Sequence, residues 1–295
     1  MVDKRKIVLV GTGFVGMSMA YSLLNQGGIN ELVLIDVLKD KAEGEAMDLA
    51  HGMPCAPNDM IIKAGDYDEC KDANIVVITA GLSQKPGQTR LDLASANAKI
   101  MKEITESVVA SGFKGIFLIA SNPVELMTYV VREVSGFDSS KVIGSGTVLD
   151  TARLRYLIGK YLKVSSKNVH AYIMGEHGDS SFVPWNHANV GCKKMTEIMK
   201  DNKHPMSDLE KIYTEVQQAA YEIINRKKAT YYGIGLGLTK IIKAILNDQN
   251  EIMTVSTYLK GEYGHEGLYI GVPTIINRKG AREVLELPLE GDEKA

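Results

Sequence analysis

The stretch from Asp150 to Asp179 contains side-chain types that together suit acid–base chemistry on a small carboxylic acid. Arg153 carries a planar fork of donors that matches a carboxylate with two parallel hydrogen bonds. His177 can exchange a proton near neutral pH, and a carboxylate such as Asp150 can fix its tautomer and stabilise the imidazolium. The spacing leaves open whether these side chains meet, and each by itself is also typical of a solvated helix face or a glycine-flanked loop.

The size and charge of the chain indicate a globular protein without a polyanionic partner. It has 295 residues, of which 45% are hydrophobic, enough to form a substantial core. The 34 Lys and Arg residues nearly balance the 36 Asp and Glu residues, and the net charge is -2. This balance provides no general attraction to nucleic acid or to an anionic membrane, so we expect neither partner.

Cysteine usage and hydropathy favour a cytoplasmic protein. Cys55, Cys70 and Cys192 are odd in number, far apart and not at metal-ligand spacing, so we expect no disulfide framework and no bound metal. The basic start of the chain precedes an apolar run, as in a signal peptide, but Gly11 and Gly13 interrupt it and we interpret it as a strand. No run approaches the roughly 18 apolar residues that span a bilayer.

A strand, a glycine-rich turn and a helix are predicted at the start of the chain. The apolar residues 7–10 precede Gly11-Thr12-Gly13-Phe14-Val15-Gly16 and then helical periodicity. The glycines permit a tight turn and close approach of a pyrophosphate, which the helix N-terminus attracts. Asp36 ends a second apolar run 20 residues after Gly16, where a carboxylate binds a ribose and repels a 2′-phosphate. We therefore predict NAD binding; the alternative is a surface aspartate that closes a strand.

Apolar runs alternate with helical patterns through the first half of the chain. Further strands are predicted at residues 32–35, 75–79 and 115–119, and helices at 91–112 and 124–134. This alternation is typical of an α/β protein with a doubly wound parallel sheet, here a Rossmann-type domain over residues 1–144. Ligands bind at the carboxyl ends of such strands, where Gly81, Ser121 and Asn122 occur. We expect residues 145–295 to form a mixed α+β substrate domain.

The segment at residues 81–90 is polar and rich in glycine and proline. Such a segment is typical of a lid that closes over a ligand and excludes water. Closure would bring Arg90 to a substrate carbonyl, where a cation stabilises the developing oxyanion more than the neutral ground state. The alternative is an exposed turn without a role, the more common fate of such sequences.

The motifs occur in the order found in bacterial L-lactate dehydrogenases, and the chain resembles these members of the lactate/malate dehydrogenase family over nearly its whole length. The motifs that carry the resemblance are the glycine turn, the segment 81–90, Ser121-Asn122-Pro123, Asp150-Thr151-Ala152-Arg153 and Gly175-Glu176-His177-Gly178-Asp179. It implies reversible hydride transfer between NADH and pyruvate, giving L-lactate and NAD, as in glycolytic fermentation. His177 would exchange the proton, Asp150 would orient His177, and Arg90 would polarise the carbonyl.

The resemblance also implies which residues bind each ligand. Those implied for the substrate are Gln84, Arg90, Asn122, Arg153 and Thr230. Those implied for NAD are Gly11, Gly13, Phe14, Val15, Asp36, Lys41, Tyr67, Gly81, Ser121, Asn122 and Ser145.

Position 84 separates the alternatives within the family. Related malate dehydrogenases carry an arginine there that pairs with the second carboxylate of oxaloacetate, whereas this chain has Gln84. Burying an unpaired anion costs several kcal/mol, or about three orders of magnitude in discrimination if roughly 4 kcal/mol is realised. We therefore expect pyruvate and lactate as substrates. The alternatives are malate, branched 2-hydroxy acids, and a non-catalytic NAD-binding or structural protein.

Arg155 and His170 resemble the pair that binds fructose 1,6-bisphosphate between subunits of homotetrameric, allosteric bacterial relatives. Both side chains can donate hydrogen bonds to phosphate, His170 best when protonated. We expect an allosteric homotetramer; the alternative is a pair of ordinary surface residues.

The end of the chain departs from the resemblance. After Leu289 the chain stops at Ala295, whereas the relatives continue into a long C-terminal helix near the lid. We expect the difference to affect lid closure and stability.

Overall fold

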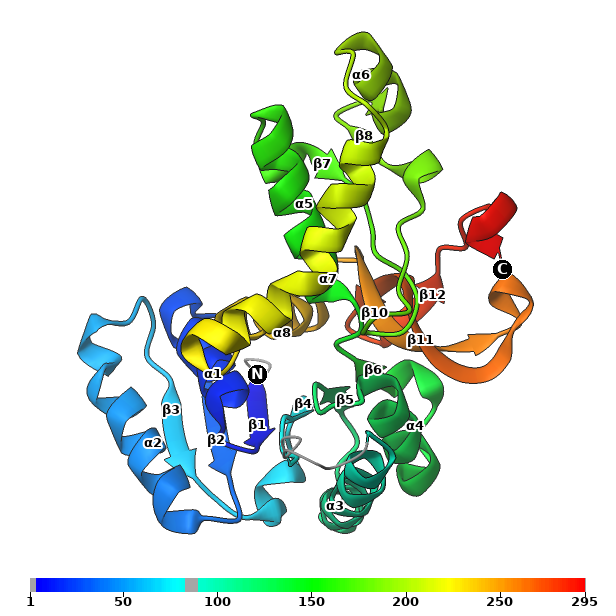
Figure 1. Cartoon of the computed structure of the whole chain (residues 1–295). Helices are drawn as coiled ribbons and strands as arrows, with labels where there is room; N and C mark the ends of the chain where they lie inside the picture. The colour runs from blue at the N-terminus through cyan, green and yellow to red at the C-terminus, as the bar shows by residue number, and fades with distance from the viewer. Residues whose placement is uncertain (1–3, 83–89, 295) are drawn as a thin grey trace.

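The structure, a computed structural model, describes residues 4–82 and 90–294, and the side chains of all of these except residues 90–92, 292 and 294 (Figure 1). The strands are β1 Lys6–Val10, β2 Glu31–Ile35, β3 Ile61–Ala64, β4 Ile75–Ile78, β5 Ile116–Ile119, β6 Val142–Gly144, β7 Val169–His170, β8 Asn189–Val190, β9 Lys193–Lys194, β10 Glu251–Lys260, β11 Glu266–Asn277 and β12 Gly280–Val284. The α-helices are α1 Phe14–Gln26, α2 Lys39–His51, α3 Arg90–Ala110, α4 Val124–Ser135, α5 Val148–Leu162, α6 Met195–Asp201, α7 Ser207–Lys227 and α8 Tyr232–Leu246. Short 3₁₀ helices lie at Met53–Cys55, Tyr67–Cys70, Ser139–Lys141, Ser166–Asn168, Trp185–His187, Glu262–Gly264 and Gly291–Lys294.

Six parallel strands form the predicted doubly wound sheet. Their spatial order is β3-β2-β1-β4-β5-β6, which is the Rossmann-type order. Strand β1 lies at the centre, with Val8 opposite Val33 on β2 and Val76 on β4. The five residues of β1 are all buried, as expected for a parallel strand covered on both faces. The prediction of an α/β fold with this sheet is confirmed.

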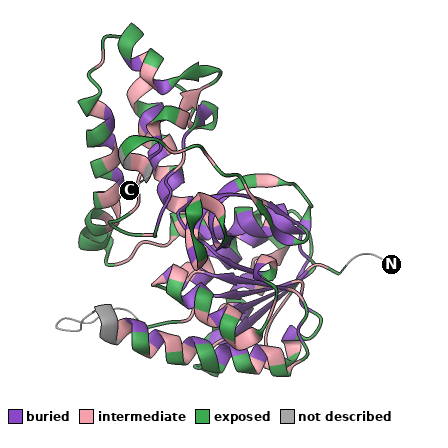
Figure 2. Cartoon of the chain, turned by 90° about the vertical axis from the view of Figure 1, so that its right-hand side faces the viewer, coloured by how far each residue is buried: buried purple, intermediate pink, exposed green. Residues whose placement is uncertain are grey.

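Helices cover both faces of the sheet and bury its apolar side chains. Helices α1, α2 and α8 pack on one face and contribute Leu23, Ala42 and Leu238 to the core there. Helices α3 and α4 pack on the other face, where Met101 and Met127 lie among the buried residues. In Figure 2 the strands are buried while the outer sides of the helices are exposed.

The sheet does not end with the Rossmann-type strands. The antiparallel strands β10, β11 and β12 extend it beyond β6, giving nine strands in one sheet. The junction pairs Ser256 of β10 with Gly144 of β6. A Cβ atom at Gly144 would lie 2.5 Å from Thr128 Oγ1 and 2.8 Å from Ser256 Cβ, so glycine permits this close approach. The sequence patterns predicted two differently built parts but did not indicate that they share a sheet.

A second core lies outside the large sheet. Helices α5, α6 and α7 surround the small antiparallel sheet β7-β8-β9 and bury an apolar cluster that includes Leu154, Val169, Met199 and Leu209. Figure 1 shows these elements projecting from one side of the large sheet. Helix α5 follows β6 directly and therefore connects the two cores.

Within the described residues, no helix is both long and apolar enough to cross a membrane. The same residues contain no group of three or more His, Cys, Asp or Glu side chains that could hold a metal ion.

Candidate active site

Asp150, Arg153 and His177 meet where the two cores join. Asp150 lies in the first turn of α5, and Arg153 lies one turn later on the same helix. His177 comes from the loop after β7, and its Nδ1 lies 2.6 Å from Asp150 Oδ2. Arg153 donates a hydrogen bond of 3.1 Å to Asp150 Oδ1. Each carboxylate oxygen therefore has its own partner, and Nε2 of His177 has none among the described residues.

The charged forms of Asp150 and His177 are favoured because their hydrogen bonds and neighbouring charges outweigh the effect of burial on their pKa values. Burial by itself lowers the pKa of His177, but the hydrogen bond and charge of Asp150 raise it above the ordinary value of 6.5. Burial by itself raises the pKa of Asp150, but the hydrogen bond and charge of His177, together with the charge of Arg153, lower it below 3.8. Both shifts favour the state in which a carboxylate faces an imidazolium.

Buried hydroxyl groups hold the His177 loop against α5. Thr151 accepts a hydrogen bond of 2.9 Å from the Ile173 backbone N–H, and Thr147 donates one of 2.5 Å to the Ile173 carbonyl. Gly175 exchanges two backbone hydrogen bonds with Gly271 of β11, at 2.9 and 3.0 Å. The position of His177 therefore depends on both α5 and the antiparallel extension of the sheet.

Glu125 is a neighbour of His177 that sequence reasoning missed. Its Oε1 accepts hydrogen bonds from the His177 backbone N–H at 3.3 Å and from Ser256 Oγ at 2.7 Å. Its Oε2 is buried without a partner in the described part of the chain. Burial raises the pKa of this carboxyl despite these hydrogen bonds. The signal that could have found it is an acidic residue directly after Ser121-Asn122-Pro123-Val124.

The glycine turn and Asp36 form one cluster at the carboxyl ends of β1 and β2. Asp36 Oδ2 accepts hydrogen bonds from the Thr12 backbone N–H at 2.7 Å and from its hydroxyl at 2.8 Å. Burial by itself raises the pKa of Asp36, but backbone hydrogen bonds from Leu38 and Thr12 lower it. Lys41 Nζ donates to the Thr12 carbonyl, and Tyr67 is half-buried near the Asp36 charge.

The glycines of this cluster fit a dinucleotide. Gly11 has φ +101°, and a Cβ there would lie 2.6 Å from the Ala80 backbone N. Gly13 precedes α1 with open space where a Cβ would be, and no side chain caps this helix N-terminus. Phe14 and Val15 form its first turn, so free N–H groups face that space and would hold a pyrophosphate.

The other residues implied for NAD lie at the same edge of the sheet. Ser121 is buried after β5 and donates a hydrogen bond of 2.5 Å to the Ala80 carbonyl. Asn122, which follows Ser121, is connected to the segment near Gly81 through Asn97. The Asn97 side chain donates a hydrogen bond of 2.9 Å to the Asn122 carbonyl and accepts one of 2.8 Å from the Leu82 backbone N–H. Ser145 is buried directly after β6.

Of the other residues implied for the substrate, the structure describes Thr230 and the backbone of Arg90. Thr230 lies between α7 and α8, beside Tyr231, whose ring stacks on Phe14 at 5.1 Å between centroids. Gln84 lies outside the described residues. Arg90 begins α3, but its side chain is not among those described.

Arg155 and His170 lie on the adjacent elements α5 and β7. Arg155 Nε donates 3.2 Å to the Ala171 carbonyl, and its guanidinium lies 5.4 Å from the centre of the Tyr172 ring. His170 is exposed.

Comparisons with known proteins agree with this geometry. Residues 5–144 match the family model for the lactate/malate dehydrogenase NAD binding domain, and residues 147–295 match the one for the alpha/beta C-terminal domain. The chain therefore belongs to the lactate/malate dehydrogenase family, and its cofactor is NAD.

Three similar proteins are from Bacillus and Enterococcus species. The chain is 55% identical over 291 residues to L-lactate dehydrogenase 2 of Bacillus cereus, covering 98% of this chain and 93% of the relative. It is 55% identical over 290 residues to L-lactate dehydrogenase 1 of Bacillus anthracis, covering 98% and 92%. A crystal structure of the minor L-lactate dehydrogenase from Enterococcus mundtii in the ligands-bound form has a TM-score of 0.97 at 52% identity, covering 99% of this chain and 93% of that one.

The Asp150→Asn variant should lose stability in a pH-dependent way. The raised pKa of His177 contributes stability below about pH 6.5, which is lost as the pH rises through the folded-state pKa. The lowered pKa of Asp150 contributes stability above about pH 3.8, which is lost as the pH falls through its folded-state pKa. The difference in unfolding free energy from the wild type should be largest near about pH 5 and smaller near about pH 9.

Urea unfolding at the two pH values measures this difference. Asp59→Asn, at an exposed position, is the matched control and should show no such trend. An equal difference at both pH values for Asp150→Asn would contradict the charged pair.

Proposed function

We propose that the chain is an NAD-dependent L-lactate dehydrogenase that interconverts pyruvate and L-lactate. The observation that carries this proposal is the His177–Asp150 contact, with Arg153 on the second carboxylate oxygen, in a member of the lactate/malate dehydrogenase family. The relatives at 55% identity are named L-lactate dehydrogenases. In this proposal residues 1–144 form the NAD-binding domain and residues 145–295 form the substrate domain.

The chain's own groups hold the substrate and move one proton, while bound NADH supplies the hydride. Because Nδ1 of His177 faces Asp150, Nε2 is left for the substrate oxygen. Protonated His177 donates from Nε2 as pyruvate is reduced and takes the proton back as lactate is oxidised. Asp150 stabilises the required imidazolium. Arg153 donates one hydrogen bond to Asp150 and has further donors for the substrate carboxylate.

The remaining substrate contacts follow from the family resemblance. Arg90 stabilises the charge that develops on the carbonyl oxygen, and Asn122 donates a further hydrogen bond. The Asn122 side chain is exposed and has no partner among the described residues, so its amide is available. Gln84 and Thr230 provide a small neutral pocket, which suits the methyl group of pyruvate better than a second carboxylate.

We also propose a cytoplasmic homotetramer. Large apolar side chains are exposed on the neighbouring helices α1, α2 and α8, among them Tyr21 at 61%, Met47 at 59% and Leu236 at 57%. Exposed apolar side chains gathered on one surface favour association between subunits. The free state of Cys55, Cys70 and Cys192 is consistent with a reducing compartment.

His177→Ala should reduce the turnover number by about 10²- to 10⁴-fold, the usual contribution of a general acid–base group, without a comparable loss of NADH affinity. NADH oxidation with pyruvate and with oxaloacetate, together with NADH binding, measures both effects. His51→Ala, at an exposed position, is the control. Retained turnover in His177→Ala would remove His177 from catalysis, and a wild-type preference for oxaloacetate would overturn the substrate assignment.

Gln84→Arg should shift the ratio of kcat/KM from pyruvate toward oxaloacetate by up to about 10³-fold, because the new cation pairs with the second carboxylate. Steady-state kinetics with both keto acids measures the shift. Gln249→Arg adds the same charge at an exposed position and should leave the ratio unchanged. An unchanged ratio in Gln84→Arg would mean that specificity is set elsewhere.

Fructose 1,6-bisphosphate should activate the enzyme through Arg155 and His170, because both side chains can donate hydrogen bonds to phosphate. Initial rates of pyruvate reduction at several activator concentrations measure the effect. Activation should be lost in the Arg155→Ala/His170→Ala variant. Rates that do not respond to the activator in the wild type would contradict this assignment.

A further inference from the structure

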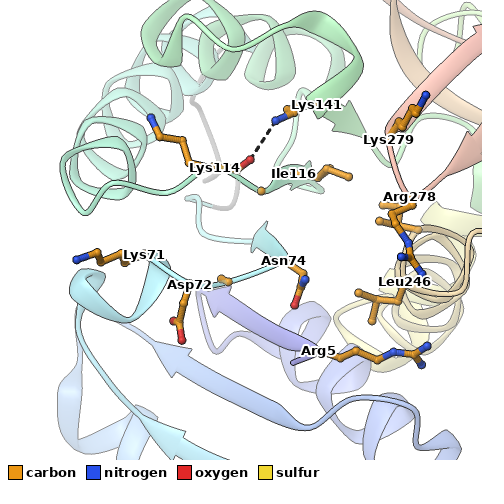
Figure 3. A pocket seen from close by; sticks show the side chains of 13 residues that line it. Arg5, Lys71, Asp72, Asn74, Lys114, Ile116, Lys141, Leu246, Arg278 and Lys279 are labelled. Atoms are coloured by element: carbon orange, nitrogen blue, oxygen red, sulfur yellow. Dashed lines mark hydrogen bonds between the residues drawn. The ribbon is translucent and has the colours of Figure 1, made fainter. Parts of the chain in front are cut away.

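A cavity of about 490 Å³ opens at the edge of the large sheet opposite the active site. It lies at the amino ends of β1, β4, β5 and β6, bordered by the end of α8 and the turn between β11 and β12. Figure 3 shows Asn74, Ile116 and Leu246 between rim residues that come from both sides. The site is therefore separate from the NAD cluster and from His177, which lie at the carboxyl ends of the strands.

Cationic side chains dominate the lining. They are Arg5, Lys71, Lys114, Lys141, Arg278 and Lys279. The acidic residue in the lining is Asp72, and it is already paired, with Lys6 at 2.6 Å and Lys4 at 2.9 Å. The lining thus has a large excess of positive charge, which a cavity wall of low polarity strengthens.

The negative end of a helix near the cavity compensates only part of the positive charge of the lining. Helix α8 ends at Leu246, and the carbonyl groups of one helix C-terminus carry roughly half a unit of negative charge. Lys141 satisfies a backbone acceptor, because its Nζ donates 3.1 Å to the Lys114 carbonyl. Arg5 also donates 3.1 Å to a backbone acceptor, the Gly28 carbonyl. The lining nevertheless combines six cationic side chains with one acidic side chain, Asp72.

The cavity also has an oriented neutral donor and an apolar wall. Asn74 Oδ1 accepts a hydrogen bond of 2.7 Å from the Lys6 backbone N–H, which fixes the amide plane. Asn74 Nδ2 has no partner in the described part of the chain and is left as a donor to the cavity. Ile116, Ile245 and Leu246 form the apolar part of the lining.

We propose that this cavity binds an organic phosphate, with the phosphate held by the rim cations and Asn74 and the organic part on the apolar wall. The geometry of charge plus apolar surface distinguishes it from a site for a bare anion. Because it lies at the far edge of the sheet, it would be occupied together with NAD.

Calorimetric titration of the full chain, saturated with NADH to fill the nucleotide site, tests the proposal with phenyl phosphate and inorganic phosphate as probes. Phenyl phosphate should bind more tightly, because its ring covers the apolar wall. The variant Lys114→Glu/Lys279→Glu should weaken phenyl phosphate binding by about tenfold or more through loss of two cations and gain of two anions. Both side chains are exposed, so the variant should fold and keep its rate of pyruvate reduction.

Two control variants locate the site. Lys160→Glu/Lys200→Glu makes the same charge change at exposed positions on α5 and α6, and it should bind phenyl phosphate as the wild type does. Arg155→Ala/His170→Ala removes the other candidate phosphate site and should also retain binding. The proposal is overturned if the wild type binds neither probe, if Lys114→Glu/Lys279→Glu binds as the wild type does, or if either control variant loses binding.

Discussion

The buried Asp150 carboxylate is the constraint on which the arrangement of the active site depends. A charge placed inside a protein costs several kcal/mol unless it is paired and hydrogen-bonded. Asp150 meets this requirement with His177 on one oxygen, Arg153 on the other, and the first turn of α5 behind it. The same contacts that stabilise the buried carboxylate also orient His177 and raise its pKa. Stability and proton transfer therefore rely on the same pair.

The hydrogen bond between His177 and Asp150 forms only if the His177 loop is held in place, and the extended sheet holds it. Backbone hydrogen bonds between Gly175 and Gly271 connect the loop to β11. The backbone N–H of His177 also donates to Glu125 at the start of α4. The antiparallel strands join the parallel ones at Gly144, where only a glycine allows the approach of Ser256. The shared sheet thus gives the NAD cluster and the proton-transfer pair a fixed relation, because both are anchored at its strand ends.

The two edges of the large sheet present opposite ends of the packed helices. At the carboxyl edge, helix N-termini and glycine turns leave backbone donors facing the ligand region, and both oxygens of Asp36 and of Asp150 have hydrogen-bond partners. At the amino edge, helices such as α8 end, and lysine and arginine side chains gather around a cavity. This polarity follows from parallel strands connected by helices, because all the connecting helices then run in the opposite direction to the strands.

The sequence by itself determined the strand–glycine–helix unit, the alternating pattern of the Rossmann-type sheet and the residue types needed for proton transfer. These follow from local periodicity and from the backbone freedom of glycine, which act within a few residues. Only the tertiary structure decided that Asp150 and His177, 27 positions apart, are in contact, that Glu125 supports the loop from 52 positions away, and that β10 joins β6. Such contacts depend on packing and strand register between distant segments, which local periodicity does not encode.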